Sequence, residues 1–152
     1  LKSSVGPNTR LDMAVDGTDL VIQADATRIE QVLINLVTNA AQAMDSKKGK
    51  ITVSADRFST PEPLYFPLMD LQAGDYIRVG VEDDGPGIRK EHLQQIFDPY
   101  FSTKTGQANS GLGLAVVHGI VQTYGGAIHI HTKPGQGTIF YIYLPAHSAR
   151  VL

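Results

Sequence analysis

The longest regular pattern in the sequence is a stripe of apolar residues between Arg28 and Met44. Apolar side chains recur there every three or four positions, which is the spacing of one buried face of an α-helix. Asp25 precedes the stripe as a predicted N-cap, and Lys47-Lys48-Gly49 follows it as a predicted stop. The pattern therefore predicts an amphipathic helix that packs on a core.

Shorter patterns predict the rest of the fold. Apolar or alternating runs favour strands over residues 9–15, 20–22, 51–55, 76–81, 127–131 and 138–144, and helices over residues 90–96 and 112–124. Gly125-Gly126 is predicted to end the last helix. Residues 57–74 contain three prolines and little periodicity, which predicts a surface excursion between two paired strands. This order predicts an α/β domain of the α+β sandwich type, with a mixed, mostly antiparallel sheet covered on one face by about three helices.

Composition limits the classes of function. The 152 residues are 42% hydrophobic and 18% charged, which indicates one globular domain over residues 1–152 with a core from about 10 to 145. A net charge of -2 gives no electrostatic reason to expect nucleic acid or an anionic membrane as a partner. The absence of cysteine excludes disulfides and thiolate metal sites and fits a reducing compartment. Because the chain begins without Met, we expect it to be excised from a longer protein.

A row of amides lies beside the apolar stripe of the first helix. Asn35, Asn39 and Gln42 follow one another at positions i, i+4 and i+7. An uncharged amide at the edge of a buried face can meet a ligand at a lower desolvation cost than an unpaired carboxylate, and an Asn oxygen can bind magnesium. The same amides could instead cap neighbouring loops, which is the commoner arrangement for an Asn taken alone.

Two glycine-rich segments accompany these amides. Asp83 ends an apolar strand and is followed by Gly85 and Gly87, which allow the backbone to approach a ligand closely. A carboxylate at the base of a pocket suits the exocyclic amine of adenine, although ordinary turns share this composition. Gly111-Leu112-Gly113-Leu114 opens a helix, whose N-terminal amides favour phosphate, but alone it is as typical of a hinge. It is neither a Walker-type loop nor a dinucleotide fingerprint.

Order and spacing together resemble one family, the catalytic and ATP-binding domain of bacterial sensor histidine kinases. Its superfamily includes the ATPase of DNA gyrase, MutL and the heat-shock chaperone ATPases. Residues 30–43 are similar to the N box, 83–88 to the first glycine box, 96–104 to the F box, 111–114 to the second glycine box and 135–140 to the closing glycine box. The resemblance covers roughly residues 10–145 and implies a Bergerat-type ATP-binding fold.

The resemblance implies roles for individual residues. Asp83 would hold the adenine amine, with Thr138 supporting it through water. Asn39 would bind magnesium that bridges the phosphates, with Asn35 nearby as a catalytic residue. Glu30 is a candidate acid/base group that could equally be a surface charge. The nucleotide-binding set is completed by Gly85, Gly87, Ile88, Lys104, Gly111, Leu112, Gly113 and Leu114. Residues from about 100 to 110 would form the ATP lid, anchored by Phe97 and Phe101.

Three departures from the family pattern affect these expectations. Many members carry Asn where this chain has Asp84, which we interpret as a loop variant. Some kinases place a phosphate-contacting Lys where Gln42 stands, so Lys104 or Arg28 becomes the expected cation. Hydrolytic members carry Glu at the position of Asn35, and its absence favours phosphoryl transfer over hydrolysis.

The acceptor of the phosphoryl group is expected to lie elsewhere. None of the five histidines has the sequence context of an acceptor; they are His92, His118, His129, His131 and His147. The resemblance implies a cytoplasmic domain that binds ATP and magnesium, phosphorylates a histidine on a separate dimerisation domain and serves a downstream response regulator, with no nucleic acid or direct membrane contact. A regulatory nucleotide-binding module, a serine kinase of the anti-sigma-factor type and a scaffold that binds no nucleotide stay open as alternatives.

Overall fold

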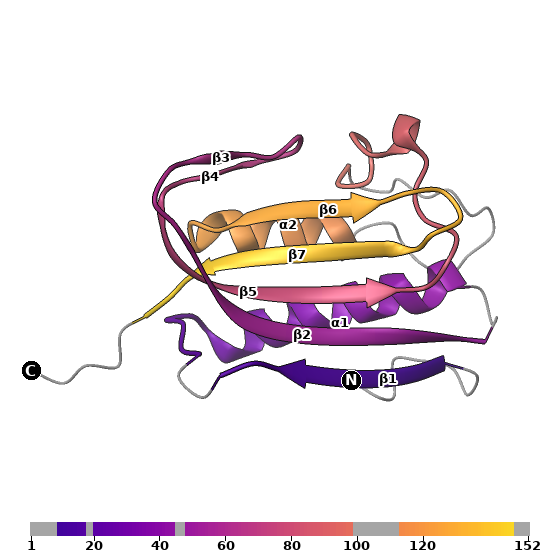
Figure 1. The fold of residues 1–152 in the computed structure, drawn as a ribbon, viewed down its shortest axis with the longest axis horizontal. Coiled ribbons are helices and arrows are strands. Elements are labelled where there is room, and N and C mark those ends of the chain that lie inside the picture. The colour runs from indigo at the N-terminus through magenta and orange to yellow at the C-terminus, as the bar shows by residue number, and fades with distance from the viewer. Residues whose placement is uncertain (1–8, 18–19, 45–47, 99–112, 148–152) are drawn as a thin grey trace, which may run out of the picture.

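The computed structural model describes residues 9–17, 20–44, 48–98 and 113–147. Five strands form the main sheet in the order β1-β2-β5-β7-β6, and two α-helices lie on one of its faces (Figure 1). The strands are β1 (Thr9–Val15), β2 (Gly49–Thr60), β5 (Gly74–Asp83), β6 (Ala127–Thr132) and β7 (Thr138–Pro145), and the helices are α1 (Ala26–Met44) and α2 (Gly113–Thr123). Only β1 and β2 pair in parallel, so the predicted mixed, mostly antiparallel sheet is confirmed.

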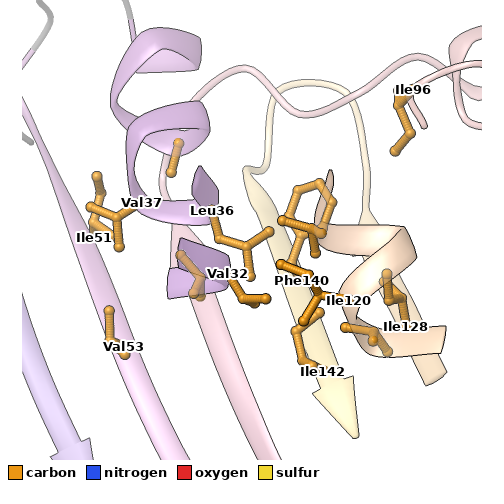
Figure 2. Close-up of a cluster of buried hydrophobic side chains, with 14 of the residues drawn as sticks. Val32, Leu36, Val37, Ile51, Val53, Ile96, Ile120, Ile128, Phe140 and Ile142 are labelled. Carbon is orange, nitrogen blue, oxygen red and sulfur yellow. The ribbon is translucent and has the colours of Figure 1, made fainter. Parts of the chain in front are cut away.

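The core lies between the helices and the sheet. The apolar stripe of α1 is buried as its spacing predicts, with Leu36 and Val37 fully enclosed. Figure 2 shows these side chains facing Ile51 of β2 and Phe140 of β7. Burying a large aliphatic side chain stabilises a fold by about 1.5–3 kcal/mol, so this cluster fixes the position of α1 on the sheet.

The predicted N-cap of α1 and the predicted glycine stop after α2 are confirmed, whereas Gly49, predicted as part of the stop of α1, is the first residue of β2. The Oδ1 atom of Asp25 accepts a hydrogen bond from the Thr27 N–H at 2.9 Å, as an N-cap does. Helix α2 ends at Thr123, Gly125 beyond it has a φ of 72°, and the N–H of Gly126 donates to the Val121 carbonyl at 3.0 Å. Residues 45–47, which contain part of the predicted stop of α1, lie outside the described residues.

Two short predicted elements are wrong. Residues 20–22 form no strand among the described residues; Ile22 makes one isolated bridge to Ala146. The predicted helix over residues 90–96 is a single 3-10 turn, η2 (Lys90–His92), followed by turns. One helical turn fixes several dihedral angles for little hydrogen bonding, so a short segment without a long apolar stripe does not extend into an α-helix. The described chain thus has two α-helices on the sheet rather than three.

The predicted excursion is shorter and more buried than expected. Since β2 continues to Thr60 and β5 begins at Gly74, the excursion spans residues 61–73, and it contains the hairpin β3 (Leu64–Tyr65) and β4 (Asp70–Leu71). Phe66 stacks on His129 and Tyr143, on the sheet face opposite the helices. The apolar residues of this segment follow no helical or strand period, which is why the pattern alone did not reveal a packing role.

No helix within the described residues is long and apolar enough to cross a membrane.

Candidate nucleotide-binding site

Asp83 is a buried acceptor at the end of β5. Only 6% of the residue is exposed, and its Oδ1 atom accepts a hydrogen bond from the Gly85 N–H at 2.9 Å. In the register of the sheet, Asp83 lies opposite Thr138 of β7, which is 5% exposed. Burial raises the pKa of Asp83 to about 6, with smaller upward contributions from the charges of Asp84 and Glu82, while the backbone N–H groups of Gly85 and Thr138 act in the opposite direction. The site therefore holds a carboxylate that ionises near neutral pH.

The glycine loop after Asp83 packs against the turn between β6 and β7. The N–H of Gly135 donates to the Pro86 carbonyl at 2.6 Å. Gly87 has a φ of 76°, and a Cβ atom there would lie 2.2 Å from the carbonyl oxygen of Lys133. The structure shows that this glycine makes room for the neighbouring turn, and its expected approach to a ligand stays a prediction.

Helix α1 connects the two glycine-rich regions. A Cβ atom on Gly85 would lie 3.4 Å from Cγ of Met44, so the loop after Asp83 lies against the last turn of the helix. Two turns earlier, the Nδ2 atom of Asn35 donates to the Gly113 carbonyl at 3.3 Å, where α2 begins. Positions 35, 39 and 43 form one row at i, i+4 and i+8 that is about 12 Å long. Asn39 occupies its middle, half-buried, and its amide makes no hydrogen bond to another described residue.

The remaining predicted contacts divide into two groups. Ile88 and Leu114 pack against the main core, and Phe97, the predicted lid anchor, packs there and against the ring of His118 at 5.4 Å. The other predictions fall on residues 99–112, outside the described residues: the lid, Phe101, Lys104, Gly111 and Leu112.

Glu30 and Arg28 are not brought together with the asparagines. Both side chains are exposed near the start of α1. Helical geometry places Glu30 about 140° around the axis from Asn35 and about 14 Å along it from Asn39. The acid/base role suggested for Glu30 stays a prediction to which no contact among the described residues contributes.

Sequence reasoning missed two residues of the site. Asp84 is more than a loop variant, because its Oδ1 atom accepts the N–H of Lys50 at 2.9 Å and ties the loop to the start of β2. Thr132 accepts the N–H of Ile88 at 2.9 Å. The signal for Thr132 was its place one residue beyond the predicted strand 127–131, since extending the pairing puts it opposite Thr138.

No group of three or more His, Cys, Asp or Glu side chains within the described ranges could hold a metal ion. The predicted magnesium site therefore depends on the Asn39 amide and on oxygens that a ligand would supply. A cavity of about 220 Å³ lies at the opposite end of the sheet, lined by residues that include Ile22, Tyr124 and Pro145, and it takes no part in this site.

Comparison with known proteins agrees with this geometry. Residues 24–148 match the model of the histidine kinase-, DNA gyrase B- and HSP90-like ATPase family. The chain belongs to that family. Within it, the chain corresponds to the catalytic and ATP-binding domain of sensor histidine kinases, as the following relatives indicate.

The curated relatives are sensor kinases that are much longer than this chain. The chain is 38% identical over 137 residues to the sensor kinase CckA of Brucella abortus, which covers 89% of this chain and 14% of CckA. It is 40% identical over 129 residues to the sensor histidine kinase ZraS of Escherichia coli K12, which covers 85% of this chain and 24% of ZraS.

Solved structures share the fold. The nucleotide-free catalytic domain of histidine kinase ThkA is 35% identical, with a TM-score of 0.68 over 91% of this chain and 80% of that domain. Full-length ShkA in complex with AMPPNP is 26% identical, with a TM-score of 0.73 over 94% of this chain and 27% of ShkA. The predicted Bergerat-type sandwich is confirmed.

The raised pKa of Asp83 predicts a stability effect of Asp83→Asn. The folded pKa, about 6, lies above the ordinary value of 3.8. The contribution of Asp83 to stability is thus fully present below about pH 4 and is lost as the pH rises through 6. At pH 7.5 the ionised, buried carboxylate destabilises the fold, so Asp83→Asn should raise the free energy of unfolding by about 1–3 kcal/mol.

Urea unfolding without nucleotide at pH 7.5 and pH 4 checks this expectation. The increase in the free energy of unfolding caused by Asp83→Asn should shrink towards zero at pH 4. Glu82→Gln, on the exposed neighbour, is the control and should change stability by less than about 0.5 kcal/mol at pH 7.5. Equal stability of wild type and Asp83→Asn at pH 7.5 would contradict the burial argument.

A second prediction compares two glycines of left-handed conformation. Gly87 and Gly135 have φ values of 76° and 82°, but a Cβ on Gly135 would meet nothing within 4 Å. Gly135→Ala should therefore cost only the backbone strain, about 1–2 kcal/mol. Gly87→Ala adds a collision with the Lys133 carbonyl and should cost clearly more, measured by urea unfolding. Equal losses would mean that the loop and turn do not pack as described.

Proposed function

We propose that this domain binds ATP with magnesium and donates the γ-phosphoryl group to a histidine on a separate dimerisation domain. The observation that carries the proposal is that three groups lie in order along α1. The loop after the buried Asp83 contacts the last turn of the helix, the amide of Asn39 lies in its middle, and the N-terminus of α2 contacts Asn35. A nucleotide is an extended ligand with a base at one end and phosphates at the other, and this row has matching chemistry in the same order.

Asp83 would select adenine. Its carboxylate accepts hydrogen bonds, and the exocyclic amine of adenine donates them. Guanine carries an oxygen at the corresponding position, so two acceptors would face each other at a buried site and the base would give the carboxylate no donor. Thr138, opposite Asp83 on the neighbouring strand, would support the same edge of the base through water.

The phosphates would lie towards Asn39 and the start of α2. A helix N-terminus attracts anions through its free N–H groups and its dipole, and Asn35 holds this terminus against α1 through the Gly113 carbonyl. The amide oxygen of Asn39 would serve as the protein ligand of magnesium, which keeps most of its waters and neutralises phosphate charge when bound. Gly111, Leu112 and Lys104 are proposed to complete the phosphate contacts.

In the transfer, the bond between the γ-phosphorus and the bridging oxygen breaks, ADP leaves, and a bond forms to an imidazole nitrogen of the acceptor. Such transfer depends mainly on positioning and charge stabilisation, and it needs no base that activates water. Asn35 stands where hydrolytic members carry Glu, which supports transfer. CckA and ZraS are described as sensor kinases, and this chain spans 14% and 24% of them, so we infer that the acceptor domain lies in a longer parent. A downstream response regulator and a cytoplasmic location are part of the same proposal.

The test supplies ATP labelled at the γ-position together with the histidine-bearing dimerisation domain of the parent kinase. We expect acid-labile label on the histidine. Release of labelled phosphate with no labelled protein would indicate hydrolysis instead, and label on a serine-containing partner would indicate a serine kinase; either result would overturn the proposal.

The role of Asp83 predicts the behaviour of Asp83→Asn in ligand binding. The change should weaken ATP binding by about 1.5–3 kcal/mol, because a hydrogen bond to a charged acceptor is lost. Wild type should also lose ATP affinity as the pH falls through 6, where the carboxylate takes up a proton. Calorimetric titration with ATP and GTP measures both effects. Equal affinities for the two nucleotides, in wild type and variant alike, would exclude Asp83 as the base-reading group.

The role of Asn39 predicts that Asn39→Ala abolishes the magnesium-dependent part of ATP affinity. Asn39 lies at the edge of the apolar stripe, so its loss leaves no cavity in the core, and stability should change by less than about 1 kcal/mol. ATP affinity is compared with and without magnesium. A variant that keeps the full magnesium effect would make Asn39 a structural amide.

A further inference from the structure

The hydroxyl of Thr132 joins three parts of the candidate site. Its Oγ1 atom accepts the N–H of Ile88 at 2.9 Å, lies 3.1 Å from the carbonyl oxygen of Gly137, and lies 2.9 Å from Oγ1 of Thr138. These partners belong to the glycine loop, the β6–β7 turn and β7 respectively. Thr132 itself is the last residue of β6 and is half-buried.

The sheet register aligns Thr132 with the adenine-reading position. Asp83 on β5 pairs with Thr138 on β7, and Thr138 pairs with Thr132 on β6. The three residues are therefore successive neighbours across three strands. A change at Thr132 would reach the base-binding edge of the pocket through the Thr138 side chain, and it would also release the Ile88 N–H and the Gly137 carbonyl.

One arrangement of hydrogens uses every contact of the Thr132 hydroxyl. A hydroxyl has one donor and two acceptor positions. If it donates to the Gly137 carbonyl, it can accept from the Ile88 N–H and from the Thr138 O–H at the same time. The Thr138 hydroxyl then has its only hydrogen occupied, and both its lone pairs stay available to the site as acceptors.

We propose that Thr132 is a positioning and specificity-determining residue: it holds the glycine loop on β6 and turns the Thr138 hydroxyl so that only acceptors face the base. Acceptors match the amine edge of adenine and its bridging water, and they reject the carbonyl of guanine. The inference rests on the proposed function, because it assumes that adenine lies against Asp83 and Thr138.

The test compares Thr132→Val, Thr132→Ser and Thr60→Val in the 152-residue chain. Valine removes the hydroxyl at nearly constant shape, whereas serine keeps it. Thr60→Val is the matched control, since Thr60 is 8% exposed and its hydroxyl donates to the Glu62 carbonyl at 2.6 Å, at the far end of β2. Calorimetric titration with ATP and with GTP gives the affinity and the selectivity, and urea unfolding gives the stability.

Thr132→Val should weaken ATP binding about fivefold to tenfold and lower the ratio of ATP to GTP affinity, because the freed Thr138 hydroxyl can rotate and donate to guanine. Thr132→Ser should restore both values. Thr60→Val should lose stability but keep wild-type affinity and selectivity. In a Thr138→Val background the change at Thr132 should no longer alter selectivity. Should the valine variant fail to fold, Thr132→Ala carries the same expectations.

Two results would overturn the inference alone. One is a Thr132→Val variant that loses stability as Thr60→Val does and keeps wild-type affinity and selectivity. The other is an equal loss of ATP and GTP affinity, which would leave Thr132 with a structural role only. Failure of the proposed function looks different: wild type that binds no ATP, or binds it with no response to Asp83→Asn, would overturn the adenine site and the inference with it.

Discussion

The packing of α1 on the sheet is the constraint on which the candidate site depends. Leu36 and Val37 are fully buried against the strands, whereas Asn35 and Asn39, on the adjacent side of the same helix, are only half-buried. Rotation of α1 about its axis in one direction would expose apolar surface, and rotation in the other would bury amides without partners, at about 1–3 kcal/mol each. The core therefore fixes the direction of the amides, and the same helix holds Gly85 near Met44 and Gly113 near Asn35.

The buried carboxylate of Asp83 lowers the stability of the fold at neutral pH, whereas the buried residues of α1 stabilise the fold and also orient the amides. Burial raises its pKa to about 6, which means that the ionised form is destabilised in the folded chain at neutral pH. The N–H groups that oppose this shift come from the backbone, and within the described residues no cation forms an ion pair with Asp83. A buried carboxylate that no cation neutralises is costly to the fold but has a use if a ligand supplies a further donor.

Long apolar patterns predicted the helices and strands well, because burial of one face of an element leaves a periodic pattern that can be recognised within that segment alone. The stripe of α1 and the strands that become β5 and β7 are of this kind, and the pairing of β2 with β5 was predicted from the excursion between them. Short segments were predicted poorly. The turn at Lys90 lacks an extended stripe, and Phe66 packs on the sheet from a proline-rich segment without any period. In the candidate site, the family motifs identified Asp83 and the asparagines, but contacts such as Thr132 to Ile88, 44 residues apart, leave no local trace in the sequence.

The glycine boxes of this chain are therefore explained in part by contacts between loops. Gly87 makes room for the Lys133 carbonyl, and the Pro86 carbonyl accepts a hydrogen bond from the Gly135 N–H. The N–H of Ile88 donates to the hydroxyl of Thr132. The first and closing glycine boxes, about 50 residues apart in sequence, thus form one packed unit beside Asp83 and Thr138. Because the strands bearing Asp83 and Thr138 run into this unit, a substitution in either loop should displace both residues together. Part of the sequence similarity at these glycines is consequently explained by the close packing of the two loops at this end of the sheet.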